Sequence, residues 1–233
     1  ISPDLIASSY IKKLIKYQGT RQVFNFSNDN DCFINIVFKE KNNEENSIMY
    51  FQESCEKFNA KICAFIRKDK LYSIEDGDII ENNDELLLIC KEENIEDIMK
   101  LFGRNKNNKR IMIAGGGNIG RHLSENISED YQVKVIESNE ERAEFLSEII
   151  DDVTIINADS SNEDILLEEN IEHMDVFCAL TNDDEANILS AMLAKKLGSK
   201  TVLSIINKIS YSDLVENQEI DITVSPEDLT MGA

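Results

Sequence analysis

The chain has no long apolar run. No stretch of its 233 residues approaches the roughly 20 apolar residues that span a bilayer. It also lacks an opening basic segment followed by an apolar one, the pattern of a secretory leader. We therefore expect a protein that does not insert into a membrane.

The cysteines and histidines form no pattern of metal ligands or of catalytic residues. The five cysteines are odd in number, no two have C-x-x-C spacing, and most lie inside apolar runs, as Cys90 does. That favours buried reduced thiols over a metal site or thiol catalysis. His122 and His173 are the only histidines, and neither accompanies a nucleophile. We expect no catalytic residue and no metal site.

Basic residues are scarce relative to acids. Lys and Arg number 24 against 45 Asp and Glu, a net charge of −21. Long-range repulsion disfavours binding to nucleic acid or to an anionic membrane surface. An anionic ligand would therefore depend on positive potential from local backbone groups.

Proline is almost absent. Pro3 and Pro226 are the only two, and both follow an aliphatic residue and a serine and precede acidic residues and leucine. This similarity predicts that the chain, which does not begin with Met, is one period cut from a tandem array of doubly wound domains. Coincidence is the other explanation for so short a match.

The most informative pattern present is a glycine hexad, Gly115-Gly116-Gly117-Asn118-Ile119-Gly120. It follows the apolar run 110–114 and precedes a polar helical segment, and Glu137 ends a second apolar run 17 residues later. A strand, a G-x-G-x-x-G turn, a helix and a strand ending in an acid are typical of a dinucleotide site. A tight turn without a ligand is the alternative.

Each part of this pattern has a physical role. Gly115 permits the turn, Gly117 lets the backbone approach a pyrophosphate, and Gly120 lets the helix pack closely on the strand. Free N–H groups at the helix start favour phosphate. Glu137 is expected to bind the adenosine ribose hydroxyls and to repel a 2′-phosphate. Arg121 either reaches a terminal phosphate or is a solvated surface residue.

The second half of the chain alternates strand-like and helical segments, which predicts a Rossmann-like, doubly wound parallel sheet of the α/β class. Strands are expected at 110–114, 133–136, 153–156, 175–180, 201–206 and 222–224, and helices at 140–150, 162–169, 185–197 and 211–215. The first half predicts a smaller α+β domain. Its helices are expected at 6–16, 49–58 and 95–102, and its strands at 22–26, 32–39, 61–67 and 85–91.

The second half resembles the N-terminal lobe of the RCK (KTN) family, most closely the second such lobe of TrkA-type potassium-uptake regulators. The likeness is carried by the glycine hexad and by three further segments: Val135-Ile136-Glu137-Ser138-Asn139, Ala158-Asp159-Ser160-Ser161 and Ala179-Leu180-Thr181-Asn182-Asp183-Asp184-Glu185-Ala186-Asn187. The first half is similar to the C-terminal lobe of that family. The resemblance implies four parts: residues 1–19 as the end and crossover helix of a preceding N-lobe, 20–103 as a C-lobe, 104–108 as a linker and 109–233 as an N-lobe.

The resemblance also implies ligand contacts. Asp159 would recognise the adenine side, although an Asp before two serines is also a good turn or cap residue. Thr181 and Asn182 would face the nucleotide, and Thr181 could also cap the next helix with Asp184 three residues on. Glu185 is either a contact across a subunit interface or an exposed acid. The family often has an arginine after the fifth strand, where this chain has Asn207-Lys208.

By this resemblance the chain belongs to a regulatory subunit and is not an enzyme. It would bind NAD(H) or ATP/ADP, assemble as a homo-oligomer (a dimer that builds a ring), and gate a membrane potassium channel or transporter from the cytoplasmic face. Two alternatives are open: an NAD-dependent oxidoreductase, and an assembly protein whose Rossmann lobe has lost its ligand.

Overall fold

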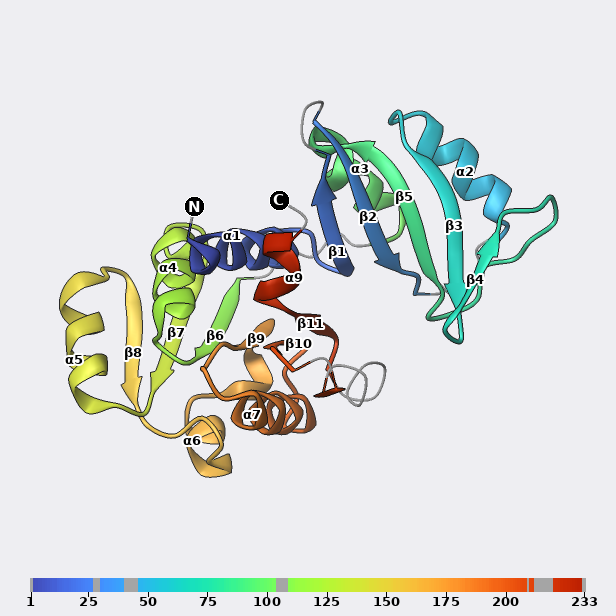
Figure 1. Ribbon diagram of the computed structural model, residues 1–233. Coiled ribbons are helices and arrows are strands. Elements are labelled where there is room, and N and C mark those ends of the chain that lie inside the picture. Colours follow the sequence, from blue (N-terminus) through green and yellow to red (C-terminus); the bar gives the residue numbers. More distant parts are fainter. Residues whose placement is uncertain are drawn as a thin grey trace. The chain divides into compact units, whose positions relative to one another are not determined.

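The computed structural model describes residues 2–26, 30–39, 46–103, 109–208, 210–211 and 220–231. The chain divides into two compact units (Figure 1). The parallel unit comprises Ile1–Ile15 and Asn108–Ala233, and the antiparallel unit comprises Lys16–Asn107. The predicted linker, 104–108, lies outside the described residues. None of the described helices has the length and apolar character needed to cross a bilayer.

The antiparallel unit is a five-stranded sheet with strand order β1-β2-β5-β3-β4, in which every neighbouring pair is antiparallel. Its helices α2 and α3 contact each other, and the Phe51 ring stacks on Phe102 at 5.1 Å. The elements are β1 (Thr20–Asn25), β2 (Asp31–Val37), α2 (Ile48–Glu56), β3 (Lys61–Arg67), β4 (Lys70–Ser73), β5 (Glu85–Lys91), the 3₁₀ turn η1 (Glu92–Asn94) and α3 (Ile95–Leu101).

Strand β4 was not predicted from the sequence. All four of its residues are exposed, so it lacks the alternation of apolar and polar residues that marks a half-buried strand. It pairs with β3 through a hairpin whose turn residues, Lys68 and Asp69, both have positive φ. Turns of this kind usually contain Gly, as in Asn-Gly or Asp-Gly, so Lys68-Asp69 is only a weak turn signal.

The parallel unit is a six-stranded sheet with strand order β11-β10-β9-β6-β7-β8, all parallel. Its elements are α1 (Pro3–Lys16, of which Lys16 belongs to the other unit), β6 (Arg110–Ala114), α4 (Asn118–Ile127), β7 (Gln132–Glu137), α5 (Glu140–Ile149), β8 (Val153–Asn157), α6 (Glu163–Glu168), η2 (Ile171–His173), β9 (Val176–Ala179), α7 (Asp184–Lys196), β10 (Thr201–Ile205), β11 (Ile222–Val224) and α9 (Pro226–Met231).

Helices cover both faces of the parallel sheet. Helices α4 and α5 lie on one side, and α6 and α7 lie on the other (Figure 1). The first strand, β6, is central, with β7 on one flank and β9 on the other, so the direction of winding reverses between β6 and β9. That crevice at the carboxyl ends of the strands is the usual ligand position in such sheets. The predicted α/β fold class is confirmed.

The core of the parallel unit follows from apolar strands that are buried on both faces. Ile111, Met112 and Ile113 of β6 are fully buried, and Phe177 at the centre of β9 is also inaccessible. The predicted strands and helices of this half agree with the structure to within a residue or two. Of the predicted helix at 211–215, only Tyr211 lies within the described part, and the short helix α9 was not predicted.

Helix α1 packs within the parallel unit. Lys12 Nζ donates to Asn126 O of α4 at 2.7 Å, and Asn118 Nδ2 donates to Asp4 Oδ2 at 3.0 Å. Ala7, Ile11 and Leu14 recur at helical spacing and are buried. The segment expected to be the crossover helix of a preceding lobe is therefore a helix that covers α4 here.

Candidate functional site: the glycine turn and the ends of four strands

The glycine turn has the backbone geometry that its sequence predicts. Gly115 has φ +103°, and its N–H donates to Ile136 O at 2.8 Å. A Cβ on Gly115 would lie 2.9 Å from Thr181 N, and one on Gly120 would lie 2.0 Å from Gly115 O. Both glycines are therefore required by the fold itself, and their predicted roles in turning and close packing are confirmed.

Gly116 is also confined by the protein. A Cβ there would lie 2.3 Å from Leu146 Cδ1 and 3.1 Å from Glu137 Oε2. A side chain would therefore meet backbone at Gly115 and Gly120, and at Gly116 it would require Leu146 and Glu137 to move.

Gly117 differs from these three glycines. Its φ is −61°, and a Cβ would meet nothing within 4 Å. It is the N-cap of α4 and has no side chain to bond the helix N–H groups, so those of Asn118 and Ile119 have no hydrogen-bond partner among the described residues. The protein leaves open space and unbonded donors at this one position of the turn.

Glu137 joins the turn to the next helix. Its Oε2 accepts from Gly116 N at 2.7 Å, and its Oε1 accepts from Asn139 N at 2.8 Å. These bonds fix the carboxylate beside the turn, at the carboxyl end of β7. Each oxygen keeps a further lone pair that could accept from a ribose hydroxyl.

Arg142 is a residue that the sequence reasoning missed. Its Nε donates to Gly116 O at 2.9 Å, and its guanidinium lies 5.4 Å from the centroid of the Phe145 ring. The Arg142 guanidinium therefore lies against Gly116, the residue that precedes the open position at Gly117. A signal was available: Arg142 is the first basic residue after Glu137, in the first turn of the following helix.

Arg121 and Asn118 make contacts within the protein. Arg121 Nη1 donates to Glu125 Oε1 at 2.8 Å, one helical turn further along α4, and Arg121 Nη2 lies 3.2 Å from His122 Nε2. To reach a phosphate at the turn, Arg121 would have to leave this exposed ion pair, which costs little. Asn118 is held by Asp4, and Ile119 is half-buried.

Asp159 forms a turn after β8. Its Oδ1 accepts from Ser161 N at 2.8 Å and from Ser161 Oγ at 2.7 Å. These bonds lower the pKa of Asp159 below its ordinary value. The helix that follows is capped by Asn162, whose side chain accepts from Asp164 N. Of the two local roles considered, the turn is observed and the cap is not. Contact with adenine stays a prediction.

The expected capping role of Thr181 is wrong. Helix α7 begins at Asp184, and its cap is Asp183, whose Oδ1 accepts from Ala186 N at 2.9 Å. Thr181 lies earlier in the loop, and its hydroxyl donates to Asn187 Oδ1 at 2.7 Å. Asp183, and not Thr181, lies directly before the helix, so the Asp183 side chain forms the cap. Asn182 is exposed in the same loop.

Asn187 holds this loop in place. It is fully buried, and its Oδ1 also accepts from Thr181 N at 2.8 Å. Its Nδ2 donates to Thr181 O at 2.9 Å and to Ile205 O at 3.1 Å. One side chain thereby ties the carboxyl end of β9 to the carboxyl end of β10.

After the fifth strand, where the resembling family often has an arginine, this chain has Asn207 and Lys208. Asn207 Nδ2 donates to the buried carboxylate of Asp184 at 2.9 Å. Lys208 Nζ donates to Glu185 Oε1 at 3.0 Å, and Tyr211 Oη donates to the same oxygen at 2.7 Å. The bonds from Tyr211 and Lys208 lower the pKa of Glu185 to about 2. Both candidate substitutes for the arginine thus have partners within the chain.

Burial limits the reactivity of most of the cysteines. Cys32, Cys55, Cys90 and Cys178 are buried, Cys63 is exposed, and all five are free. Burial raises the pKa of Cys55 and of Cys178 to about 12, so neither carries thiolate near neutral pH. Among the described residues, no cluster of His, Cys, Asp and Glu could hold a metal ion.

Comparison with solved structures agrees with this architecture. The GsuK channel superposes with a TM-score of 0.66 at 15% identity, over 99% of this chain and 41% of that one. The GsuK channel bound to NAD gives 0.64 at 15% identity, again over 99% and 41%. At such low identity the likeness concerns the fold alone.

Sequence comparison is more specific. Residues 111–226 match the TrkA-N domain family. The Trk system potassium uptake protein TrkA of Vibrio alginolyticus is 36% identical over 235 residues, which is 100% of this chain and 51% of that protein. The TrkA protein of Haemophilus influenzae is 37% identical over 238 residues, with the same coverage. The chain thus spans about half the length of these relatives, and it belongs to the TrkA family of potassium uptake proteins.

Proposed function

We propose that the parallel unit binds NAD(H) or ATP/ADP at the glycine turn and serves as a nucleotide sensor in a regulator of potassium uptake. The open space over Gly117 carries this proposal. Packing within the chain accounts for Gly115, Gly116 and Gly120, but it leaves the fourth glycine unexplained. A phosphate group bound against the backbone would explain it.

The surrounding groups suit a nucleotide. The unbonded N–H groups of Asn118 and Ile119 supply positive potential to a diphosphate, which a chain of net charge −21 needs locally. The Glu137 carboxylate is fixed beside the glycine turn, and we expect it to accept from the ribose hydroxyls. Asp159, Thr181 and Asn182 follow the third and fourth strands at the same edge of the sheet, where the adenine and the remainder of the nucleotide would lie.

The regulatory part of the proposal rests on family membership. We infer that the complete protein is a homo-oligomer, built from dimers into a ring, on the cytoplasmic face of the membrane. It would be held there by a potassium channel or transporter subunit. Nucleotide binding would shift the ring between two conformations. A differential affinity of about 1–3 kcal/mol changes such an equilibrium roughly 5- to 150-fold. In this proposal residues 1–19, 20–103 and 109–233 are the crossover segment, C-lobe and N-lobe, with 104–108 as the linker.

Calorimetric titration with NAD, NADH, ATP and ADP tests the binding site. We expect at least one nucleotide to bind the wild-type chain, and Gly117→Asp to weaken its binding at least about tenfold, because the carboxylate would occupy the phosphate position. Equal affinity in the folded variant would refute the site. Absence of binding by all four nucleotides would favour an assembly protein that has lost its ligand.

The oxidoreductase alternative is tested with the same protein. NADH absorbance at equilibrium should stay constant when candidate carbonyl substrates are added to the chain. A substrate-dependent loss of that absorbance would replace the regulatory proposal with an enzymatic one.

A further inference from the structure

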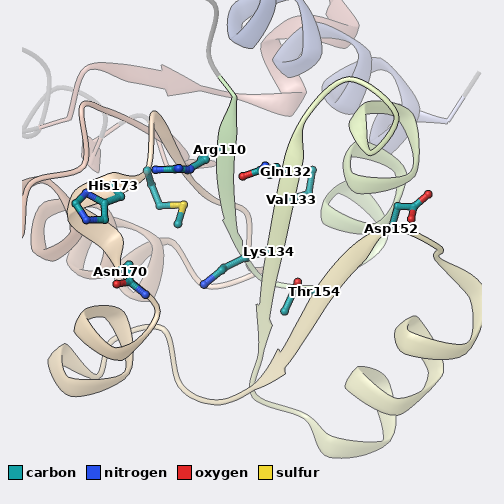
Figure 2. A pocket seen from close by; sticks show the side chains of 9 residues that line it. Arg110, Gln132, Val133, Lys134, Asp152, Thr154, Asn170 and His173 are labelled. Atoms are coloured by element: carbon teal, nitrogen blue, oxygen red, sulfur yellow. The ribbon is translucent and has the colours of Figure 1, made fainter.

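A pocket of about 460 Å³ lies at the amino ends of the strands in the parallel unit, opposite the glycine turn (Figure 2). Arg110 begins β6, and Gly115 follows its end. Five residues at about 3.3 Å each separate the two positions by roughly 16 Å. The volume falls within the range of about 300–1,000 Å³ that is usual for small-molecule sites. The lining residues are Arg110, Gln132, Val133, Lys134, Asp152, Thr154, Asn170, His173 and Met174.

The sheet face under this pocket changes character along the strands. At the carboxyl half, Ala114, Ile136 and Ile156 form one row across β6, β7 and β8 and join the apolar core. Two residues earlier, the row contains Met112, Lys134 and Thr154, so it is apolar and buried on β6 but polar on β7 and β8.

The row nearest the amino ends is polar on β6 as well, because Arg110 pairs with Gln132. Sheets with helices on both faces usually have apolar strands throughout. Here α6 has only six residues, and polar side chains take the place of a packed face.

Arg110 is the cation at this pocket with no partner. Its side chain has no hydrogen bond or ion pair within the described part of the chain, although acids outnumber basic residues almost two to one. Every other described arginine donates to an acceptor: Arg21 to Glu85, Arg67 to Asp84, Arg121 to Glu125 and Arg142 to Gly116 O. An unpaired guanidinium on a concave polar surface suits an oxyanion, which it binds through two parallel N–H groups.

The two other basic side chains that line the pocket lie close to acids. Lys134 Nζ donates to Glu169 at 2.6 Å, which neutralises its charge but leaves one N–H free. His173 lies 3.8 Å from Glu172 and is largely exposed.

Two carboxylates lie near the lining residues. Asp175 is paired with Lys200 and accepts from the backbone of Lys109 and Arg110. Asp152 lies apart from Arg110, Asn170 and His173, on the other side of β7 (Figure 2). Neither therefore compensates the guanidinium of Arg110.

We propose that this pocket is a second ligand site, for a small organic oxyanion bound by the Arg110 guanidinium. Lys134 points from β7 toward Asn170 across the pocket (Figure 2), so these two side chains, with Gln132 and Thr154, can bond the remaining polar groups of the ligand. The site does not depend on the nucleotide proposal, because none of its residues belongs to the glycine turn.

The test is a titration of the 233-residue chain with inorganic phosphate, citrate and ribose 5-phosphate. Calorimetry measures the affinity, and backbone amide chemical shifts locate the bound probe. We expect at least one probe to bind with a Kd below roughly 1 mM. The shifts should be centred on residues 110, 132–134, 152–154 and 170–174. Arg110→Gln should weaken binding at least tenfold, and Arg110→Lys, which keeps the charge but loses the fork, should weaken it less.

Two controls separate this site from the others. Lys196→Gln removes one exposed positive charge at the end of α7 and should leave the affinity unchanged. Gly117→Asp should also leave it unchanged, even if nucleotide binding is lost. The proposal is overturned if no probe binds, if the shifts centre on 115–121, or if Arg110→Gln binds as the wild type does. Should Arg110→Gln fail to fold, the wild-type shift map decides.

Discussion

Gly117 and Gly120 lie on the same turn, but a methyl group at each would meet different surroundings. At Gly120 it would overlap Gly115 O, whereas at Gly117 it would point into open space. We predict that Gly120→Ala lowers the free energy of unfolding by about 1–3 kcal/mol through overpacking. Gly117→Ala should cost less than about 1 kcal/mol and yet weaken nucleotide binding about tenfold. Denaturant unfolding and calorimetric titration of both variants measure the two effects, and a stable Gly120→Ala variant would contradict the packing argument.

Glu137 and Arg142 together predict cofactor selectivity at the scale of single residues. Glu137 should repel a 2′-phosphate, so the wild-type chain should prefer NADH to NADPH. Glu137→Gln keeps the size of the side chain and removes its charge, and it should narrow that preference several-fold. Arg142 bonds Gly116 O beside this position and can pair with the added phosphate.

The control for this prediction is the double variant. Arg142→Gln in the Glu137→Gln background should remove the affinity gained for NADPH, as measured by competitive titration. If the ratio of NADH to NADPH affinity is the same in all three proteins, Glu137 has no part in ribose recognition.

At the scale of elements, α7 is fastened to the ends of two strands by its buried polar side chains. Asn187 makes four hydrogen bonds, to three groups of Thr181 and to Ile205 O. Asn187→Ala would leave buried backbone groups unpaired, which costs about 1–3 kcal/mol for each group that water cannot reach. We predict a clear fall in Tm and weaker nucleotide binding, because the loop carrying Thr181 and Asn182 loses its anchor.

Ser190→Ala is the matched control on the same helix. Ser190 is equally buried, but its hydroxyl makes one bond, to Asn187 O at 3.2 Å. We expect a small change in Tm and unchanged nucleotide affinity. Thermal melting and calorimetric titration of both variants distinguish a specific role of Asn187 from a general intolerance of α7 to change.

At the scale of the whole molecule, two units with separate cores predict two thermal transitions. A nucleotide at 100 times its Kd stabilises the state that binds it by about 2.7 kcal/mol. We expect it to raise the Tm of the parallel unit alone in differential scanning calorimetry, and Gly117→Asp to abolish that shift. A single transition that the nucleotide shifts as a whole would mean that the units unfold together.

The local sequence was sufficient wherever one strong pattern acted alone. The apolar runs of β6, β7 and β9 and the periodicity of α1 predicted these elements to within a few residues. The G-x-G-x-x-G turn predicted its own backbone, because only glycine tolerates φ +103° at Gly115 or a carbonyl 2.0 Å from a Cβ at Gly120. Weaker patterns did not predict their elements. Strand β4 is an example, because all four of its residues are exposed and it has no alternation of apolar and polar residues.

Which side chains meet was decided by the tertiary fold. The bond of Arg142 to Gly116 joins positions 26 residues apart, and that of Asn187 to Ile205 joins positions 18 residues apart. No local sequence pattern predicts either bond. The pocket at Arg110 arises because parallel strands align their amino ends and a short α6 leaves polar rows uncovered. Conformational preference and burial pattern are properties of neighbouring residues in the chain, and the chemistry of both sites depends on contacts that exist only after the sheet is assembled.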